Sequence, residues 1–363
     1  MHLDTAVKPL AEVAIPDALL HTVSQRANDI DSGKYVTRDI FPALANAGLV
    51  DLGAPFNAAN KLVHQAGVLH DLAERSLSVA FALWGHRMAI EYLTITGGAF
   101  AETLLPQLRA GTTPGVSAMA PGFKNFAGAG DLGLWLQYDD DGSLRLSGRL
   151  DWASNLYSDA MVVAPAYGPK NASGSRQKVI IAFPLNAPGI TVGPQLDLLA
   201  LQGTASTFVT IDDVVIDEQH ILTDNFDAFI QRARPTLSTL QSSFCLGLAT
   251  ASYQQAHHNA TGLNAVFSPQ IQKLGEQLAT AKQHLSDLAH RVATDNPPHP
   301  KQLLSLRVEA GRLAADLATL ELKTAGGKGY VTTSDTNRRY REATFIPVQS
   351  PSEAQLQWEL DRS

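Results

Sequence analysis

The chain has 363 residues, of which 45% are hydrophobic and 17% are charged, and its formal net charge is −7. This composition is ordinary for a globular enzyme and excludes a wholly disordered chain. The negative charge, without any block of Lys or Arg, argues against a nucleic-acid surface, and no run approaches the roughly 20 apolar residues of a membrane-spanning helix. The lone cysteine, Cys245, cannot form an internal disulfide, and Met1 to Pro16 lack the pattern of a signal peptide, so we expect a cytoplasmic protein.

Residues 1 to 115 are predicted to form an N-terminal helical domain. The run from Asp39 to Leu49 has helical apolar spacing and contains a glycine that would end the helix. The same spacing recurs from Val63 to Leu77 and from Val79 to Ile95, with few strand-forming residues, and a short helix is expected to begin at Leu104.

Residues 116 to 222 change character and are predicted to form a β-barrel domain. Short β-rich runs alternate with turn residues, and Asp139-Asp140-Asp141-Gly142 is typical of a hairpin. The strands expected most clearly are 132–138, 144–148, 161–164, 179–183 and 208–211. About 100 residues is a usual size for a barrel or sandwich domain.

Residues 223 to 363 return to helical spacing and are predicted to form a C-terminal four-helix bundle. One apolar stripe runs from Ile271 to Leu288 and a second from Leu303 to Leu320, with a proline-rich break between them. This pattern predicts two long antiparallel helices. The fold class is therefore an α+β multidomain protein, helical at both ends and β in the middle.

The most specific motif lies between residues 326 and 343. It reads GGKGY and is followed, after six residues, by NRRYREA. Two glycines after a helix are a common stop signal, but capping does not require the third glycine or the fixed interval to the basic run. Because glycine lacks Cβ, its backbone N–H groups can approach a phosphate closely. The stretch resembles the C-terminal signature of the acyl-CoA dehydrogenase superfamily.

This resemblance covers most of the chain and implies a flavin oxidoreductase. The family binds FAD between the β-domain and the C-terminal bundle, and FMN is the alternative cofactor. Family members are usually homotetramers or homodimers in which the glycine motif, here Gly326 and Gly327, contacts a neighbour's cofactor. The resemblance also implies a small-molecule substrate such as an acyl-CoA, and an electron-transfer or reductase partner.

A second match lies in residues 147 to 155. By this resemblance Trp152 would flank the isoalloxazine ring and Ser154 would hydrogen-bond the flavin near N5. An indole is a large flat apolar wall, and a hydroxyl can donate or accept. The alternative is that Trp152 packs on the sheet and Ser154 is a turn residue.

Other cofactor positions depart from the family pattern. Met119 and Ala120 stand where the family opens its β-domain, but the usual Thr and Glu are missing, so only their backbone groups could reach the flavin. Phe267 matches a family position near the cofactor phosphates, but Asn264 replaces the arginine expected there. Lys323 could supply that charge, although a lysine late in a helix is usually just solvated.

The largest departure concerns the catalytic base. The family has a glutamate where this chain has Gln349, and an amide cannot take a proton at neutral pH. The helix from Arg234 to Gln255 contains no Asp or Glu, and Glu353 matches a helix-start position of the family. Dehydrogenation of an acyl-CoA-like substrate at a CH–CH group is the first functional hypothesis, without its usual base.

A branch of the same fold, resembling dibenzothiophene monooxygenase, uses reduced flavin and oxygen and needs no such base. Members of that branch place a histidine on an N-terminal helix facing the flavin, and His86 matches it. The alternative is a packing histidine. Catalytic candidates are therefore His86, Ser154 and Gln349. Two-component monooxygenation is the second hypothesis, and a non-catalytic binding protein is the third. No metal-ligand spacing is visible, so no metal is expected.

Overall fold

The computed structural model describes residues 13 to 362; residues 1 to 12 of the predicted N-terminal domain lie outside the described part. The first part of this chain is helical, as predicted. Its centre is α4, which begins after Ser76, whose hydroxyl accepts a hydrogen bond from the backbone N–H of Val79. The helices are α1 (Asp17–Asp31), α2 (Phe41–Asn46), α3 (Leu62–Arg75), α4 (Leu77–Thr96) and α5 (Gly98–Arg109).

The middle part is one eight-stranded sheet that contains all of the strands expected most clearly. The strand order is β6-β7-β3-β2-β4-β5-β8, with β1 beside β4, and the predicted hairpin joins β2 to β3. The strands are β1 (Gly115–Ser117), β2 (Leu134–Tyr138), β3 (Leu144–Ala153), β4 (Met161–Lys170), β5 (Arg176–Pro184), β6 (Ile190–Val192), β7 (Thr207–Ile216) and β8 (Ile221–Thr223).

One helix interrupts the β-rich part and was not predicted. It is α6 (Ala120–Phe126), and it follows β1 directly. Pro121 lies in its first turn, where the N–H that proline lacks would have had no partner within the helix. The sequence pattern missed it because the helix is too short to show a period.

The last part is helical and includes the predicted antiparallel pair. The two apolar stripes, 271–288 and 303–320, are buried along α8 and α9. Helix α7 packs against both of them and against α3 and α4. The helices are α7 (Phe226–His258), α8 (Ser268–Arg291), α9 (Pro300–Ala325), α10 (Asp335–Phe345) and α11 (Glu353–Leu360).

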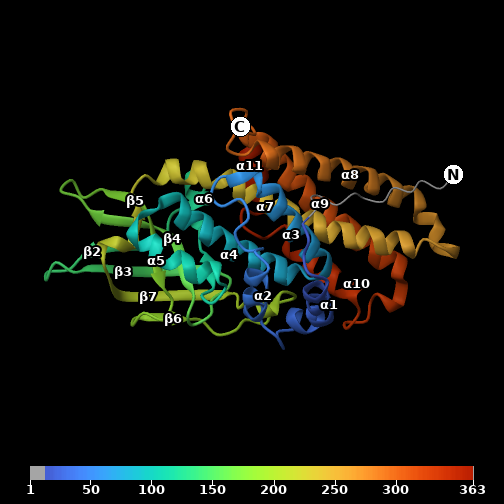
Figure 1. Cartoon of the computed structure of the whole chain (residues 1–363), viewed down its shortest axis with the longest axis horizontal. Coiled ribbons are helices and arrows are strands. Elements are labelled where there is room, and N and C mark those ends of the chain that lie inside the picture. The colour runs from blue at the N-terminus through green and yellow to red at the C-terminus, as the bar shows by residue number, and fades with distance from the viewer. Residues whose placement is uncertain (1–12, 363) are drawn as a thin grey trace.

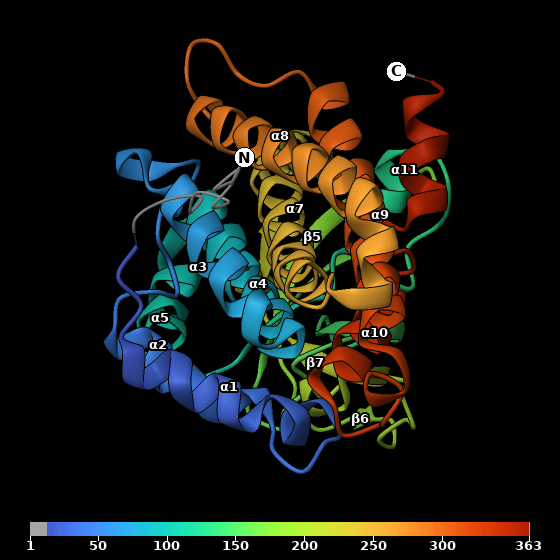
Figure 2. The ribbon, with the colours of Figure 1, turned by 90° about the vertical axis from the view of Figure 1, so that its right-hand side faces the viewer.

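The described residues form two large hydrophobic cores. Helices from both ends of the chain share one core, while the sheet encloses its own. Figure 1 shows the strands gathered at one end of the molecule and α8 and α9 at the other. In Figure 2, α7 lies between α4 and α9. The domain boundaries at residues 115 and 222 stay a prediction. No helix within residues 13–362 is long and apolar enough to cross a membrane.

Candidate active site

A pocket opens where the sheet meets the helices. It is lined by segments of α4, α6, β3, α7 and the loop after α10, and its volume is about 170 Å³. Five residues that sequence reasoning proposed for the site line this one pocket: Met119, Ala120, Trp152, Ser154 and Gln349. They come from three segments far apart in the chain. The fold therefore brings together one half of the predicted site.

The walls of the pocket are aromatic and were not predicted. Phe81 and Trp84 come from one face of α4, and their rings stack with centroids 5.5 Å apart. Phe345 meets the ring of Phe81 edge-on at 4.9 Å. Phe123 from α6 completes these walls, and the lining contains no charged side chain. The sequence signal for this wall is an aromatic pair three residues apart on a helix, a spacing that is equally typical of core packing.

Asn155 fixes the end of β3 against the helices. Its backbone adopts a φ of 63°, which asparagine tolerates better than most residues. Its side-chain amide donates to the carbonyl of Ala82 in α4 at 2.8 Å and to that of Gly115 in β1 at 3.1 Å. Trp152 and Ser154 directly precede this anchor, so their positions on the pocket wall are set by α4 and β1.

Gln349 lies at the pocket with both polar atoms of its side chain engaged. Its Oε1 accepts a hydrogen bond from the Arg307 guanidinium at 2.9 Å, and its Nε2 donates to the carbonyl of Ser350 at 2.7 Å. Arg307 is buried, and no carboxylate forms an ion pair with it within residues 13–362. Gln349 is thus a fixed wall residue, and neither of its atoms can take a proton from a substrate.

His86, which the sequence proposed as a catalytic residue, does not line the pocket. It is fully buried, its Nδ1 accepts from the backbone N–H of Gly115 and its Nε2 donates to the carbonyl of Leu108, both at 2.9 Å. Burial lowers its pKa to about 4, although the bond to Leu108 opposes that shift. The packing alternative therefore describes His86, which ties α4 to β1 and to the end of α5.

The other proposed cofactor residues form a second group around the end of α9. Phe267, Lys323, Gly326 and Gly327 do not line the pocket. Phe267 is the last residue of the 3-10 turn η5 (Gly262–Phe267). In that turn the side-chain amide of Asn264 donates a hydrogen bond to the carbonyl of Thr324 at 2.7 Å. On a single chain, the predicted phosphate-binding residues and the predicted ring-binding residues are separate groups.

The three glycines of the motif have different structural reasons. Gly326 ends α9 at a φ of 58°, in the region that favours glycine. A Cβ at Gly329 would meet the side chains of Ala325 at 2.7 Å and Thr336 at 2.9 Å, so that glycine is required by packing. A Cβ at Gly327 would meet no atom within 4 Å. Of the three, only Gly327 has neither a positive φ nor a close neighbour to its Cβ position among residues 13–362.

The basic run after the glycines is structural. Arg339 makes two hydrogen bonds to Glu321 of α9, at 2.9 and 2.6 Å, and both residues are buried. Arg338 pairs with Glu342 at 3.2 Å within α10. The pair of Arg339 with Glu321 holds α10 against α9, and the pair of Arg338 with Glu342 lies within α10 itself. We name Glu321, Arg338, Arg339 and Glu342 the α10 charge network.

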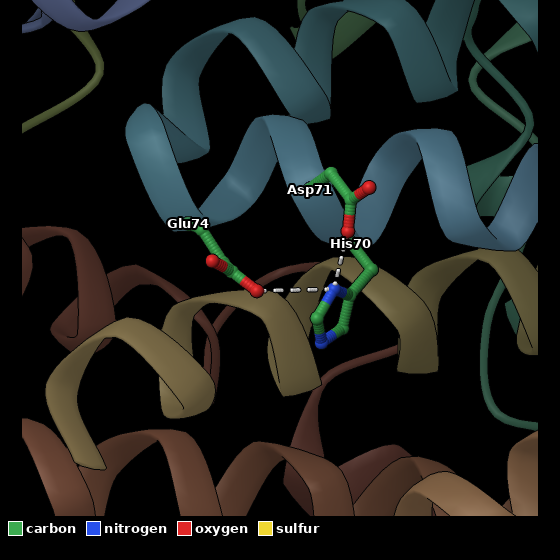
Figure 3. A group of neighbouring side chains, drawn as sticks. All are labelled: His70, Asp71 and Glu74. Carbon is green, nitrogen blue, oxygen red and sulfur yellow. Dashed lines mark hydrogen bonds and ion pairs between the residues drawn. The ribbon is translucent and has the colours of Figure 1, made fainter. Parts of the chain in front are cut away.

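One further cluster of titratable groups, His70, Asp71 and Glu74, lies on α3 and is shown in Figure 3. The Nδ1 of His70 lies 2.9 Å from Asp71 and 3.4 Å from Glu74, while its Nε2 contacts the Thr250 hydroxyl at 3.0 Å. The Thr250 hydroxyl donates to Leu246, so Nε2 must donate to it. Lys282 interacts with the same two carboxylates, and this positive charge disfavours a cation there.

Comparisons with known proteins point to one fold. Short-chain specific acyl-CoA dehydrogenase of Mus musculus is 27% identical over 217 residues, 56% of this chain and 52% of that protein. The chain thus matches about half the length of this curated relative. Butyryl-CoA dehydrogenase of Megasphaera elsdenii superposes with a TM-score of 0.82 at 15% identity, covering 97% of this chain and 99% of that one. No protein-family model matches the chain.

The same fold is shared by a monooxygenase and by a protein solved in complex with FMN. Dibenzothiophene monooxygenase of Paenibacillus sp. A11-2 superposes with a TM-score of 0.77 at 16% identity, covering 95% of this chain and 96% of that one. KijD3, solved with FMN and a dTDP-linked amino sugar, gives 0.77 at 20% identity, covering 98% and 95%. The protein has the acyl-CoA dehydrogenase fold, and the resemblance to that superfamily is confirmed.

Proposed function

We propose that the protein is a flavin-dependent oxidoreductase that uses reduced flavin and oxygen to oxygenate a small molecule. The observation that supports this proposal is that no carboxylate or imidazole is found among the described residues that line the pocket. Gln349 cannot replace a carboxylate, because its Oε1 accepts a hydrogen bond from Arg307 and its Nε2 donates one to the carbonyl of Ser350. Dehydrogenation of a thioester needs a carboxylate to take the α-proton, whereas oxygenation by reduced flavin does not need one.

The lining residues fit a flavin ring. A flat conjugated ring needs apolar faces and a few polar groups at its edge, and the aromatic walls and Ser154 offer both. The buried indole N–H of Trp84, another lining residue, has no acceptor among the described residues. Trp152 keeps 48% of its surface exposed, which leaves room for a ring to cover it. When bound, the flavin supplies the electrons; the protein supplies the walls, the edge contacts and the exclusion of water.

The phosphate end of the flavin requires a second copy of the chain. Gly326, Gly327, Lys323 and Phe267 lie apart from the pocket, and no atom of the described residues would come within 4 Å of a Cβ at Gly327. A homodimer or homotetramer in which this group meets the neighbour's pocket would use both groups at once. FAD would extend across the interface from the pocket of one copy to the glycines of the other, while the binding of the shorter FMN would depend less on the glycines. A reductase is then the expected partner.

Acyl-CoA dehydrogenation is the second candidate function. It is favoured by the similarity to short-chain acyl-CoA dehydrogenase. Such a reaction would need a base from outside the pocket lining, since the nearest carboxylate in the sequence, Glu353, pairs with Arg312 at 2.8 Å.

Flavin reduction by a thioester separates the two functions. Protein loaded with FAD or FMN is mixed anaerobically with butyryl-CoA and longer acyl-CoAs, and flavin absorbance is followed. We expect no bleaching with the native chain. Oxygen uptake with chemically reduced flavin is then measured across a panel of aromatic, sulfur and amine compounds. Rapid bleaching by an acyl-CoA would establish the second candidate, and an absence of any flavin binding would remove both.

The variant Gln349→Glu serves as the matched arm of this experiment. It places a carboxylate beside Arg307, which would keep it ionised. Bleaching by butyryl-CoA in this variant alone would show that the pocket accepts a thioester and lacks only the base.

A further inference from the structure

Three hydroxyls run in line from the pocket into the protein. The Oγ of Ser154 lies 2.6 Å from the Oγ of Ser206, which lies 2.7 Å from the Oγ1 of Thr204. The Thr204 hydroxyl lies 2.7 Å from the carbonyl oxygen of Leu201. Thr204 is completely buried and Ser206 is 7% exposed, so water does not compete for the two inner bonds. We name Ser154, Ser206 and Thr204 the hydroxyl chain.

The direction of every bond in the hydroxyl chain follows from its inner end. A carbonyl oxygen can only accept, so Thr204 donates its single hydrogen to Leu201. Ser206 must then donate to Thr204, because Thr204 has no second hydrogen. Ser154 must in turn donate to Ser206. The Ser154 hydroxyl makes no other hydrogen bond within residues 13–362, so only its lone pairs face the pocket.

We propose that Thr204 and Ser206 are positioning residues that make Ser154 a hydrogen-bond acceptor and so give the pocket a preference for reduced over oxidised flavin. This inference rests on the proposed function. A reduced flavin ring carries an N–H at a nitrogen where the oxidised ring has only a lone pair, so the Ser154 oxygen can accept from the reduced form. Against the oxidised form two lone pairs face each other unless a bond of the hydroxyl chain breaks.

The test removes one hydroxyl without touching the pocket. In Thr204→Val, Ser206 loses its acceptor and can donate to Ser154, which frees the hydrogen of Ser154 for the ligand. Valine has nearly the shape of threonine, and the backbone N–H of residue 204 still donates to Leu201 at 3.1 Å. The control, Thr204→Ser, loses only a methyl group and retains the hydroxyl chain.

Dissociation constants for oxidised and dithionite-reduced FMN and FAD are measured anaerobically on the full chain. We expect the native protein to bind the reduced forms more tightly. The preference should fall about three- to tenfold in Thr204→Val and stay unchanged in Thr204→Ser. By linkage, a tenfold fall lowers the two-electron midpoint potential of bound flavin by about 30 mV.

The outcomes separate this inference from the proposed function. Equal binding of both redox forms by the native protein, or an unchanged ratio in Thr204→Val, overturns the role of the hydroxyl chain and leaves the oxygenation proposal standing. The expected ratios without oxygen uptake on any substrate support the hydroxyl chain and count against oxygenation. Absence of flavin binding in both redox forms overturns both proposals.

Discussion

The pocket and the α10 charge network are built in opposite ways. The pocket has no charged lining residue, its walls are aromatic, and Trp152 remains half exposed. The α10 charge network is buried and consists of paired charges that satisfy one another. The basic run that made the sequence recognisable thus belongs to the scaffold, while the pocket residues lie in less distinctive stretches. Substitutions should separate the two regions, because one acts on stability and the other on ligand binding.

The largest effect is expected from breaking the buried pair between Arg339 and Glu321. Arg339→Ala leaves the fully buried Glu321 without its charged partner, which costs about 3–5 kcal/mol of unfolding free energy. Chemical denaturation measures it. The control is Lys34→Ala, which breaks an exposed pair with Asp29 and should cost about 0–1 kcal/mol. Equal small losses in both variants would contradict the structural role assigned to the α10 charge network.

The same network predicts a pH dependence of stability. Burial raises the pKa of Glu342 to about 7, against the opposing pull of Arg338. Between its ordinary pKa and pH 7 the folded state binds more protons than the unfolded state, so stability is highest at the acidic end. The free energy of unfolding should fall as pH rises from 5 to 8, by at most about 1.4 kcal/mol per pH unit from this group.

The variant Glu342→Gln isolates this contribution. A neutral amide resembles the protonated acid, so the difference in slope between the native chain and the variant reports the titration of residue 342 alone. A steeper fall in Glu342→Gln than in the native chain would reverse the sign argued here.

In the pocket, Trp152 should differ from other exposed tryptophans of the sheet in its effect on flavin binding and not in its effect on folding. Trp152→Ala removes a flat wall and should weaken flavin binding roughly tenfold, as expected for one aromatic contact. Trp135 is the matched control: it is also on the sheet and 43% exposed, but it does not line the pocket. Both variants should change the free energy of unfolding equally, and only Trp152→Ala should change flavin titrations. Equal flavin affinities in the two variants would show that the flavin ring does not lie against Trp152.

These contrasts also explain what the sequence could reveal. Long helices and the hairpin were predictable because period and turn chemistry are local signals, and α6 was missed because one short helix gives no period. Trp152 and Ser154 were found through a motif, whereas Phe81 and Phe345 meet only through tertiary packing. The surroundings of His86 could not be predicted, because a residue type does not show which groups its ring nitrogens contact. Its partners, Leu108 and Gly115, are set by the packing of α4 against the end of α5 and β1.

The smallest effect on folding is expected for a substitution at Gly327. Because the fold should stay intact, any loss of FAD binding there would report directly on the role of the glycine. Gly327→Ala meets no neighbouring atom, and Gly327 has no positive φ, so stability should stay the same or rise by about 0.4–1 kcal/mol. Gly326→Ala, one residue earlier, should be destabilising by about 1–3 kcal/mol because its φ of 58° suits only glycine in that conformation. If the pair of glycines holds a phosphate across a subunit interface, Gly327→Ala should weaken FAD much more than FMN while the fold remains intact. Unchanged binding of FAD in a stable Gly327→Ala variant would show that the glycine only follows a helix end, and the shared phosphate site between copies would have to be abandoned.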